Sequence, residues 1–125
     1  MNLDFASVWE MISDIVPEND ALICGDEIIS WKDYDLQSSK IATALKNAGL
    51  GPNSKAGLYL NNSNEYLIGQ NAIFKIGGVP INVNYRYVAE ELIYLLDNSD
   101  SEAVFYHACY SSRIKEISGS LPNIK

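Results

Sequence analysis

The sequence predicts an α/β fold, a partial parallel sheet of strand-helix-strand units preceded by a small β-hairpin. Three short apolar runs, at residues 56–60, 79–83 and 103–106, each precede a longer segment whose apolar residues recur at helical spacing. This alternation is typical of right-handed crossovers and of a mostly parallel sheet covered on both faces. The chain has 125 residues, 47% of them hydrophobic and 20% charged, which suffices for one hydrophobic core.

The N-terminal quarter predicts a helix followed by the hairpin. Apolar residues recur at spacings of three and four between residues 4 and 16, and Pro17 ends this pattern. Two apolar runs, at residues 21–24 and 28–31, flank a turn that contains Gly25. Glycine adopts the positive φ that a tight hairpin turn requires, so we expect the two runs to pair.

The helix after the hairpin is marked at both ends. Ser30 precedes Asp33 by three residues, a variant of the capping box that predicts a helix start, and Gly49 is suited to end that helix. Its buried stripe is expected to comprise Tyr34, Ile41, Ala42, Leu45 and Ala48. Gly49-Leu50-Gly51 follows a helix, whereas a dinucleotide-binding loop precedes one, so we interpret these residues as a loop.

Three further helices are expected between and after the strands of the parallel sheet. The first begins at Asn62 and closes at Gly77-Gly78. The expected apolar faces are Tyr66, Leu67, Ile73 and Phe74 in the first helix, Val88, Leu92, Leu95 and Leu96 in the second, and Tyr110, Ile114 and Ile117 in the third.

The charge pattern argues against several classes of partner. Nine Lys and Arg stand against 16 Asp and Glu, a net charge of −7, so the chain lacks the basic surface that supplies most nucleic-acid affinity. No apolar run approaches the ~20 residues needed to cross a bilayer, and the N-terminus does not resemble a signal peptide. We expect no nucleic-acid partner, no integral membrane segment and a cytoplasmic location. Five acidic residues near the N-terminus are expected to form a solvated face: Asp4, Asp14, Glu18, Asp20 and Asp26.

The cysteines and the single histidine predict no metal site. Cys24 and Cys109 lie far apart, outside any C-x-x-C motif or His/Cys cluster, so we interpret both as reduced, small apolar residues. His107 lies beside Cys109, but nothing nearby completes a ligand set, and a histidine at a strand end beside a buried cysteine explains the pair. The sequence also contains neither familiar glycine-rich phosphate loop.

One segment carries residues that suit a ligand. Residues 77–87 run along the second predicted strand and leave it at its carboxyl end, where open α/β sheets bind ligands. Arg86 lies there, and its planar, five-donor guanidinium suits phosphate or carboxylate. A surface arginine that pairs with Glu90 or Glu91 one turn later explains the residue equally well. The residues alone leave both interpretations open.

Four motifs in order resemble the amino-terminal region of AMP-forming acyl-CoA synthetases, which belong to the adenylate-forming superfamily. They are Trp31-Lys32-Asp33-Tyr34, Gly77-Gly78-Val79-Pro80, Asn84-Tyr85-Arg86-Tyr87 and Glu90-Glu91-Leu92-Ile93-Tyr94-Leu95-Leu96. The resemblance spans nearly the whole chain. It implies that residues 1–125 are an incomplete N-terminal segment of the large AMP-binding domain. The parent enzyme would use ATP, Mg²⁺ and CoA to convert a carboxylic acid, by resemblance a fatty acid, through an acyl-adenylate into a thioester.

The resemblance also implies which parts of the site lie in this chain. The family's phosphate loop, its aromatic-Gly-x-Thr-Glu motif, its ribose-binding Asp and its C-terminal Lys have no counterpart in residues 1–125. We therefore assign no catalytic and no metal-binding residue, and expect the chain alone to be inactive and to bind none of these cofactors tightly. Arg86 matches an arginine that approaches the CoA phosphates in CoA-using relatives, which makes it the candidate cofactor-binding residue.

The expected partners are the remainder of the enzyme or another copy of the chain, and a small-molecule acyl substrate. A parallel sheet without its next strand exposes unpaired backbone groups, so we expect residues 79–83 or their neighbours to present an open, apolar edge. A function of a different class also stays open. The alternative to a ligase segment is a self-contained α/β binding or assembly module that does not catalyse.

Overall fold

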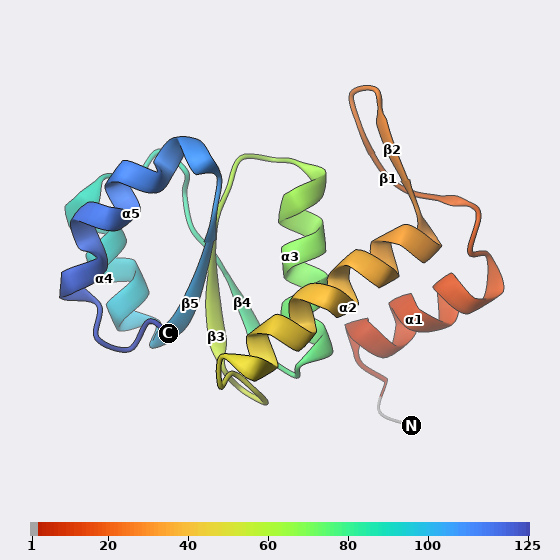
Figure 1. Cartoon of the computed structure of the whole chain (residues 1–125), viewed down its shortest axis with the longest axis horizontal. Helices are drawn as coiled ribbons and strands as arrows, with labels where there is room; N and C mark the ends of the chain where they lie inside the picture. The colour runs from red at the N-terminus through yellow and green to blue at the C-terminus, as the bar shows by residue number, and fades with distance from the viewer. Residues whose placement is uncertain (1–2) are drawn as a thin grey trace.

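The computed structural model describes residues 3–125, which fold into two small sheets and their covering helices (Figure 1). The helices are α1 (Phe5–Ile15), α2 (Trp31–Asn47), α3 (Asn64–Lys75), α4 (Ala89–Asn98) and α5 (Ser111–Ile117), with short 3-10 turns η1 (Ala108–Tyr110) and η2 (Ser118–Ser120). The strands are β1 (Asp20–Cys24), β2 (Glu27–Ser30), β3 (Lys55–Tyr59), β4 (Val79–Asn82) and β5 (Ser101–Tyr106). Among these residues no helix is long and apolar enough to cross a membrane.

The two sheets have the pairing that the sequence predicts. Strands β1 and β2 form an antiparallel hairpin, while β3 lies between β4 and β5 and pairs with both in parallel. Each parallel neighbour is reached through a helix, as parallel strands require. The α/β class, with a three-stranded parallel sheet and a separate hairpin, is therefore confirmed.

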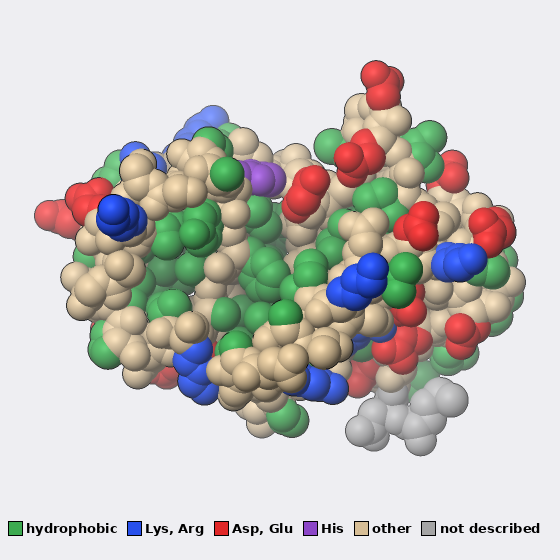
Figure 2. Space-filling model, viewed as in Figure 1, with side chains coloured by type: hydrophobic (Ala, Val, Ile, Leu, Met, Phe, Trp, Pro, Cys, Tyr) green, Lys and Arg blue, Asp and Glu red, His purple; other side chains and the backbone are tan. Residues whose placement is uncertain are grey.

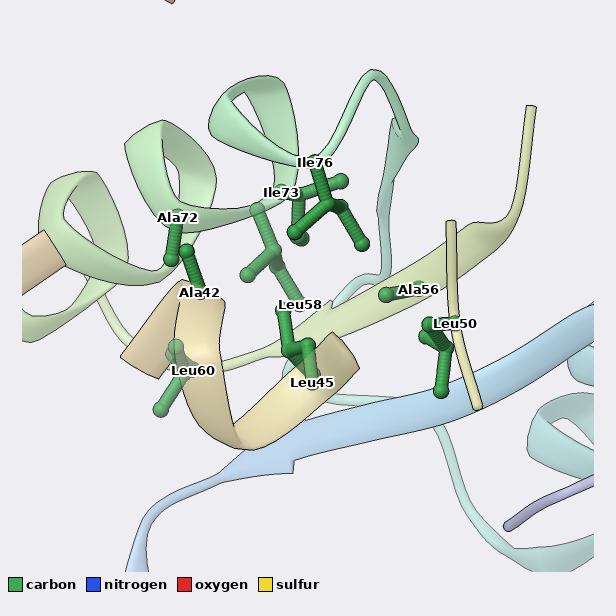
Figure 3. Packing of buried hydrophobic residues seen from close by; sticks show 9 residues of the cluster. All are labelled: Ala42, Leu45, Leu50, Ala56, Leu58, Leu60, Ala72, Ile73 and Ile76. Carbon is green, nitrogen blue, oxygen red and sulfur yellow. The ribbon is translucent and has the colours of Figure 1, made fainter. Parts of the chain in front are cut away.

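Helices cover both faces of the parallel sheet, with α2 and α3 on one side and α4 and α5 on the other (Figure 1). The side chains of β3 alternate between the two cores, because successive residues of a strand point to opposite faces. Leu58 packs into the core beneath α2 and α3 (Figure 3), and Tyr59 into the core beneath α4 and α5. The first core comprises Ala42, Leu45, Leu50, Ala56, Leu58, Leu60, Ala72, Ile73 and Ile76.

Gly57, in the centre of β3, lies directly beneath side chains of α4 and of the segment after β4. A Cβ atom at this position would lie 2.8 Å from Leu96 Cδ2 and 3.3 Å from Val83 Cγ2. The first distance is shorter than a non-bonded carbon contact, so a larger residue here would require the buried Leu96 side chain of α4 to shift.

The predicted helix ends are largely confirmed. The Ser30 hydroxyl accepts a hydrogen bond from the Asp33 amide at 3.2 Å, and Gly49, which follows the C-cap residue of α2, has a φ of +95°. The cap of α3 is Ser63 rather than Asn62, because the Ser63 hydroxyl accepts the hydrogen bond from the Tyr66 amide. The helix therefore begins one residue later than the sequence pattern indicates.

Three residues predicted to be buried are exposed. Ala48 is the C-cap of α2, where the chain turns away from the core, and Val88 lies before the first turn of α4 in extended backbone. Leu67 is 39% exposed, because α3 buries Ile68, Ala72 and Ile73, and Leu67 is rotated by about 100° from Ile68 around the helix.

An ion-pair cluster joins the first three helices. Lys75 Nζ on α3 lies 2.7 Å from Glu10 Oε1 on α1 and 2.6 Å from Asp35 Oδ1 on α2, and the Lys75 side chain is only 8% exposed. Burial disfavours the charged form, but the hydrogen bonds and charges of Asp35 and Glu10 outweigh it and raise the pKa of Lys75. This stabilisation is complete below the ordinary pKa of lysine and is lost as the pH rises through the raised value.

The surface confirms one prediction and corrects another. The five acidic residues of the N-terminal quarter are all exposed, and Figure 2 shows acidic side chains gathered over α1 and the hairpin. Cys24 and Cys109 are free thiols, as predicted, but both are exposed and not buried. Cys24 lies at the outer end of the projecting hairpin, and Cys109 in η1 after β5, so neither reaches a core.

Strands β4 and β5 are the outer strands of the parallel sheet, as the expected open edge requires. Val79 on β4 is 41% exposed, and within residues 3–125 β4 pairs with β3 alone. On β5, the Lys125 amide donates a 2.7 Å hydrogen bond to the Glu102 carbonyl, so the end of the described chain lies alongside this second edge. Within residues 3–125 neither β4 nor β5 pairs with a further strand.

We predict that the purified chain self-associates through these edges, because unpaired strands with partly apolar surfaces template further pairing. Sedimentation velocity over a range of concentrations, together with binding of a hydrophobic dye, measures this. Growth of a dimer or larger species with concentration is expected. A compact monomer at every concentration, with no excess dye binding, would instead favour the self-contained module.

Candidate functional site at the carboxyl end of the sheet

The three parallel strands end on the same side of the molecule. The segments that follow β3, β4 and β5 begin at residues 60, 83 and 107, and they lie together because the strands run in one direction. In open α/β sheets this end of the strands is where ligands bind. It carries Arg86, the residue predicted to contact a cofactor.

Residues 83–88, called the Arg86 loop below, are folded by hydrogen bonds to β3 and within the loop. The Val83 amide donates to the Leu58 carbonyl at 3.2 Å. The Arg86 amide donates to Asn84 Oδ1 at 2.9 Å, and the Tyr87 amide to the Asn84 carbonyl at 3.0 Å. An asparagine that accepts from the amide two residues later stabilises a tight turn, so the backbone on the N-terminal side of Arg86 is held in place.

The Arg86 side chain is exposed and is not paired with an acid. Its guanidinium carbon lies 5.6 Å from the centroid of the Tyr85 ring, a cation–π contact. Within residues 3–125 the ion pairs do not include Arg86, so the predicted alternative, pairing with Glu90 or Glu91, is not formed. The guanidinium donors therefore remain available to an anionic ligand.

Two side chains from other elements hold the C-terminal side of the loop. The Tyr59 hydroxyl, at the end of β3, donates to the Tyr87 carbonyl at 3.0 Å. Arg113 Nη1, on α5, donates to the same carbonyl at 3.0 Å and to the Tyr59 oxygen at 3.1 Å. The hydrogen bond to Tyr59 raises the pKa of the Arg113 guanidinium, so the residue stays charged.

Two tyrosine–asparagine pairs complete this end of the sheet. The Tyr110 hydroxyl donates to Asn61 Oδ1 at 2.7 Å, and the Tyr66 hydroxyl to Asn82 Oδ1 at 2.8 Å. Desolvation raises the pKa of both phenols, which keeps them protonated as donors. Tyr110 also stacks on the buried Tyr59, with ring centroids 4.6 Å apart.

Sequence reasoning found Arg86 but missed the residues that hold its loop. Arg113 contacts Tyr87 and Tyr59 across 26 and 54 positions of sequence, and no local pattern indicates such pairings. Tyr110 fitted the apolar face of a helix, yet its hydroxyl is bonded. Asn61 and Asn82 were the available signal, because each polar side chain lies at or just past the carboxyl end of a strand of the parallel sheet.

His107 and Cys109 do not form a ligand cluster. In the part of the chain that the structure describes, no group of three or more His, Cys, Asp or Glu side chains is placed to hold a metal ion. Cys109 is exposed, so the pairing of a strand-end histidine with a buried cysteine is wrong.

A parallel sheet with helices on both faces and polar loops at the carboxyl ends of its strands defines the class of open α/β domains. Comparison with known proteins is more specific: residues 13–124 match the family described as AMP-binding enzyme, and the chain belongs to this family.

Two relatives carry similar names. One, from Mycobacterium marinum, is a medium/long-chain-fatty-acid–CoA/3-oxocholest-4-en-26-oate–CoA ligase, 39% identical over 98% of this chain. The other, from Rhodococcus rhodochrous, is a 3-oxocholest-4-en-26-oate–CoA ligase, 35% identical over 100% of this chain. In each case the chain spans only 22% of the relative's length. The resemblance to acyl-CoA synthetases is thus confirmed, over a segment of such enzymes.

Solved structures confirm the fold. The N-terminal domain of FACL13 from Mycobacterium tuberculosis superposes with a TM-score of 0.90 at 20% identity, covering 100% of this chain and 33% of that one. A benzoate CoA ligase from Burkholderia xenovorans superposes with a TM-score of 0.90 at 16% identity, and the match covers 99% of this chain and 25% of the ligase. At such identities the likeness shows a shared fold alone.

Proposed function

We propose that this chain is the N-terminal part of a cytoplasmic, ATP-dependent acyl-CoA ligase. Such an enzyme activates a carboxylic acid, here a fatty acid, as an acyl-adenylate and transfers the acyl group to CoA. Membership of the AMP-binding family and the names of the two bacterial ligases support this class of reaction. The observation that carries the site is the exposed, unpaired guanidinium of Arg86 at the carboxyl end of the sheet.

Within this enzyme we assign Arg86 to a phosphate of CoA. Guanidinium presents five donors in a fixed plane and binds phosphate through charge-assisted hydrogen bonds. The loop around Arg86 is held by Asn84 before it and by the Tyr87 carbonyl after it, so the charge is displayed from a defined backbone position. CoA carries several phosphates far from its thiol, and a contact there anchors the cofactor without touching the reacting atoms.

ATP and Mg²⁺ are assigned no residue of this chain. Residues 3–125 bring together no cluster of acidic side chains suited to a divalent cation, and the sequence has no glycine-rich phosphate loop. In the proposed reaction the substrate carboxylate attacks the α-phosphate of ATP and releases pyrophosphate. The CoA thiol then attacks the acyl carbonyl, and AMP leaves. Arg86 acts only on the binding of CoA in this second step.

The experiment is Arg86→Ala in the complete ligase. Loss of a charged contact at a partly solvated phosphate should lower the second-order rate of thioester formation roughly tenfold to hundredfold. Adenylate formation should stay within about twofold of the parent. Rapid-quench measurement of each half-reaction separates the two, and Lys40→Ala, which removes an exposed cation from α2, is the matched control. Equal losses in both half-reactions, or no loss in either, would show that the assignment of Arg86 is wrong.

A further inference from the structure

Both arginines of the chain belong to or contact the Arg86 loop, although they lie on different elements. Arg86 is within the loop, and Arg113 reaches it from α5 through the carbonyl of Tyr87, the residue after Arg86. The two side chains differ in state. The Arg86 guanidinium faces solvent, while Arg113 makes two hydrogen bonds inside the protein, at 3.0 and 3.1 Å.

The Tyr87 carbonyl, Tyr59 hydroxyl and Arg113 guanidinium form a closed triangle of hydrogen bonds. Tyr59 and Arg113 both donate to the carbonyl, and Arg113 also donates to the Tyr59 oxygen. Every side of the triangle is 3.0 or 3.1 Å. Because one member carries a full positive charge, two of the three bonds are of the stronger, charge-assisted kind.

The Tyr59 member of the triangle is buried and packs against Tyr110. Tyr59 is fully buried in the central strand, and the Tyr110 ring stacks on it at 4.6 Å. Tyr110 is itself fixed by its hydrogen bond to Asn61, in the segment after β3. The carbonyl that follows Arg86 is therefore tied to β3, η1 and α5 together, and its position depends on how these elements pack.

We infer that Arg113 is a positioning residue for Arg86, fixing the Arg86 loop so that the exposed guanidinium meets an anionic ligand. The inference rests on the proposed role of Arg86 in binding CoA. Without the Arg113 donors the Tyr87 carbonyl keeps a single partner, the Tyr59 hydroxyl, and the loop becomes more mobile. Binding of the ligand at Arg86 then has to order the loop, which lowers the affinity.

The test uses Arg113→Met in the complete ligase, which keeps the aliphatic stem and removes the donors. Loss of positioning should raise the KM for CoA roughly threefold to tenfold, the equivalent of one hydrogen bond, and leave adenylate formation within about twofold. Lys115→Met is the matched control, since it removes an exposed cation from the same helix. Thermal unfolding of each variant shows whether the fold is retained, and Tyr59→Phe, which removes one corner of the triangle by a different route, should give the same selective rise in KM.

The double variant decides between positioning and a separate role. If Arg113 acts through Arg86, then adding Arg113→Met to Arg86→Ala should change the KM for CoA by less than about twofold. Multiplicative effects, equal losses in both half-reactions, or the same effect from Lys115→Met would overturn the inference. If Arg86→Ala weakens the use of CoA and Arg113→Met does not, only the positioning role of Arg113 is refuted. If Arg86→Ala leaves the use of CoA unchanged, the proposed contact between Arg86 and CoA is refuted as well.

Discussion

The 125-residue chain on its own should form no acyl-adenylate from ATP and a fatty acid. Adenylyl transfer depends on cations and backbone donors that are already positioned around the phosphates. Loss of a single preorganised donor in an active site costs about 10²–10³ in rate, so absence of the whole phosphate site should reduce the rate to that of the blank. Fatty-acid-dependent exchange of labelled pyrophosphate into ATP is the measurement.

The complete ligase, assayed in the same buffer with the same fatty acids, is the control that shows the assay to be sensitive. Carboxylate-dependent exchange above the blank by the pure chain would contradict the assignment of ATP and Mg²⁺ to other parts of the enzyme. Such a result would mean that residues 1–125 hold a phosphate site which neither the sequence motifs nor the structure reveals.

Leu58→Ala should destabilise the fold by about 3–5 kcal/mol, the upper part of the range for buried leucine. Leu58 lies on the central strand, is fully buried, and packs among the residues shown in Figure 3. Truncation removes its apolar area from the core and leaves a cavity that the strand cannot close, because β4 and β5 hold β3 on both sides. The free energy of unfolding, from urea titration of the parent and the variant, measures the change.

Leu67→Ala is the matched control, because it makes the same chemical change on a side chain that is 39% exposed. It should cost less than about 1 kcal/mol, as surface substitutions usually do. The pair also tests the assignment of the buried face of α3, since the sequence pattern placed Leu67 inside. Comparable losses from both substitutions would show that α3 packs with a different face toward the sheet.

Local signals allowed the elements to be predicted from sequence, but not the orientation of every helix. Ser30 caps α2 and Gly49 ends it through interactions that span only a few residues, so their chemistry is readable in the chain. The choice between Leu67 and Ile68 as the buried residue depends on where α3 meets the hairpin and α2, which is long-range information. Periodicity alone does not distinguish neighbouring phases of one helix.

The candidate site likewise contains one residue that local sequence predicts and others that only the fold brings together. Arg86 was found because it follows a strand and matches a family motif, whereas the residues that hold its loop come from β3 and α5. Arg113 reaches Tyr59 across 54 positions, and only the folded arrangement brings them together. A tyrosine hydroxyl that bonds a backbone carbonyl leaves no pattern in the sequence, so Tyr59 could be predicted as buried but not as part of the site.

The contact between Arg86 and a CoA phosphate is tested most directly with a cofactor that has no phosphate. Pantetheine carries the reactive thiol of CoA and lacks its nucleotide. The complete ligase and its Arg86→Ala variant should therefore use pantetheine equally, within about twofold, whereas with CoA the variant should show roughly tenfold to hundredfold lower kcat/KM. An equal loss with both thiols would contradict the phosphate contact and place the effect of Arg86 on the fold or on the chemical step.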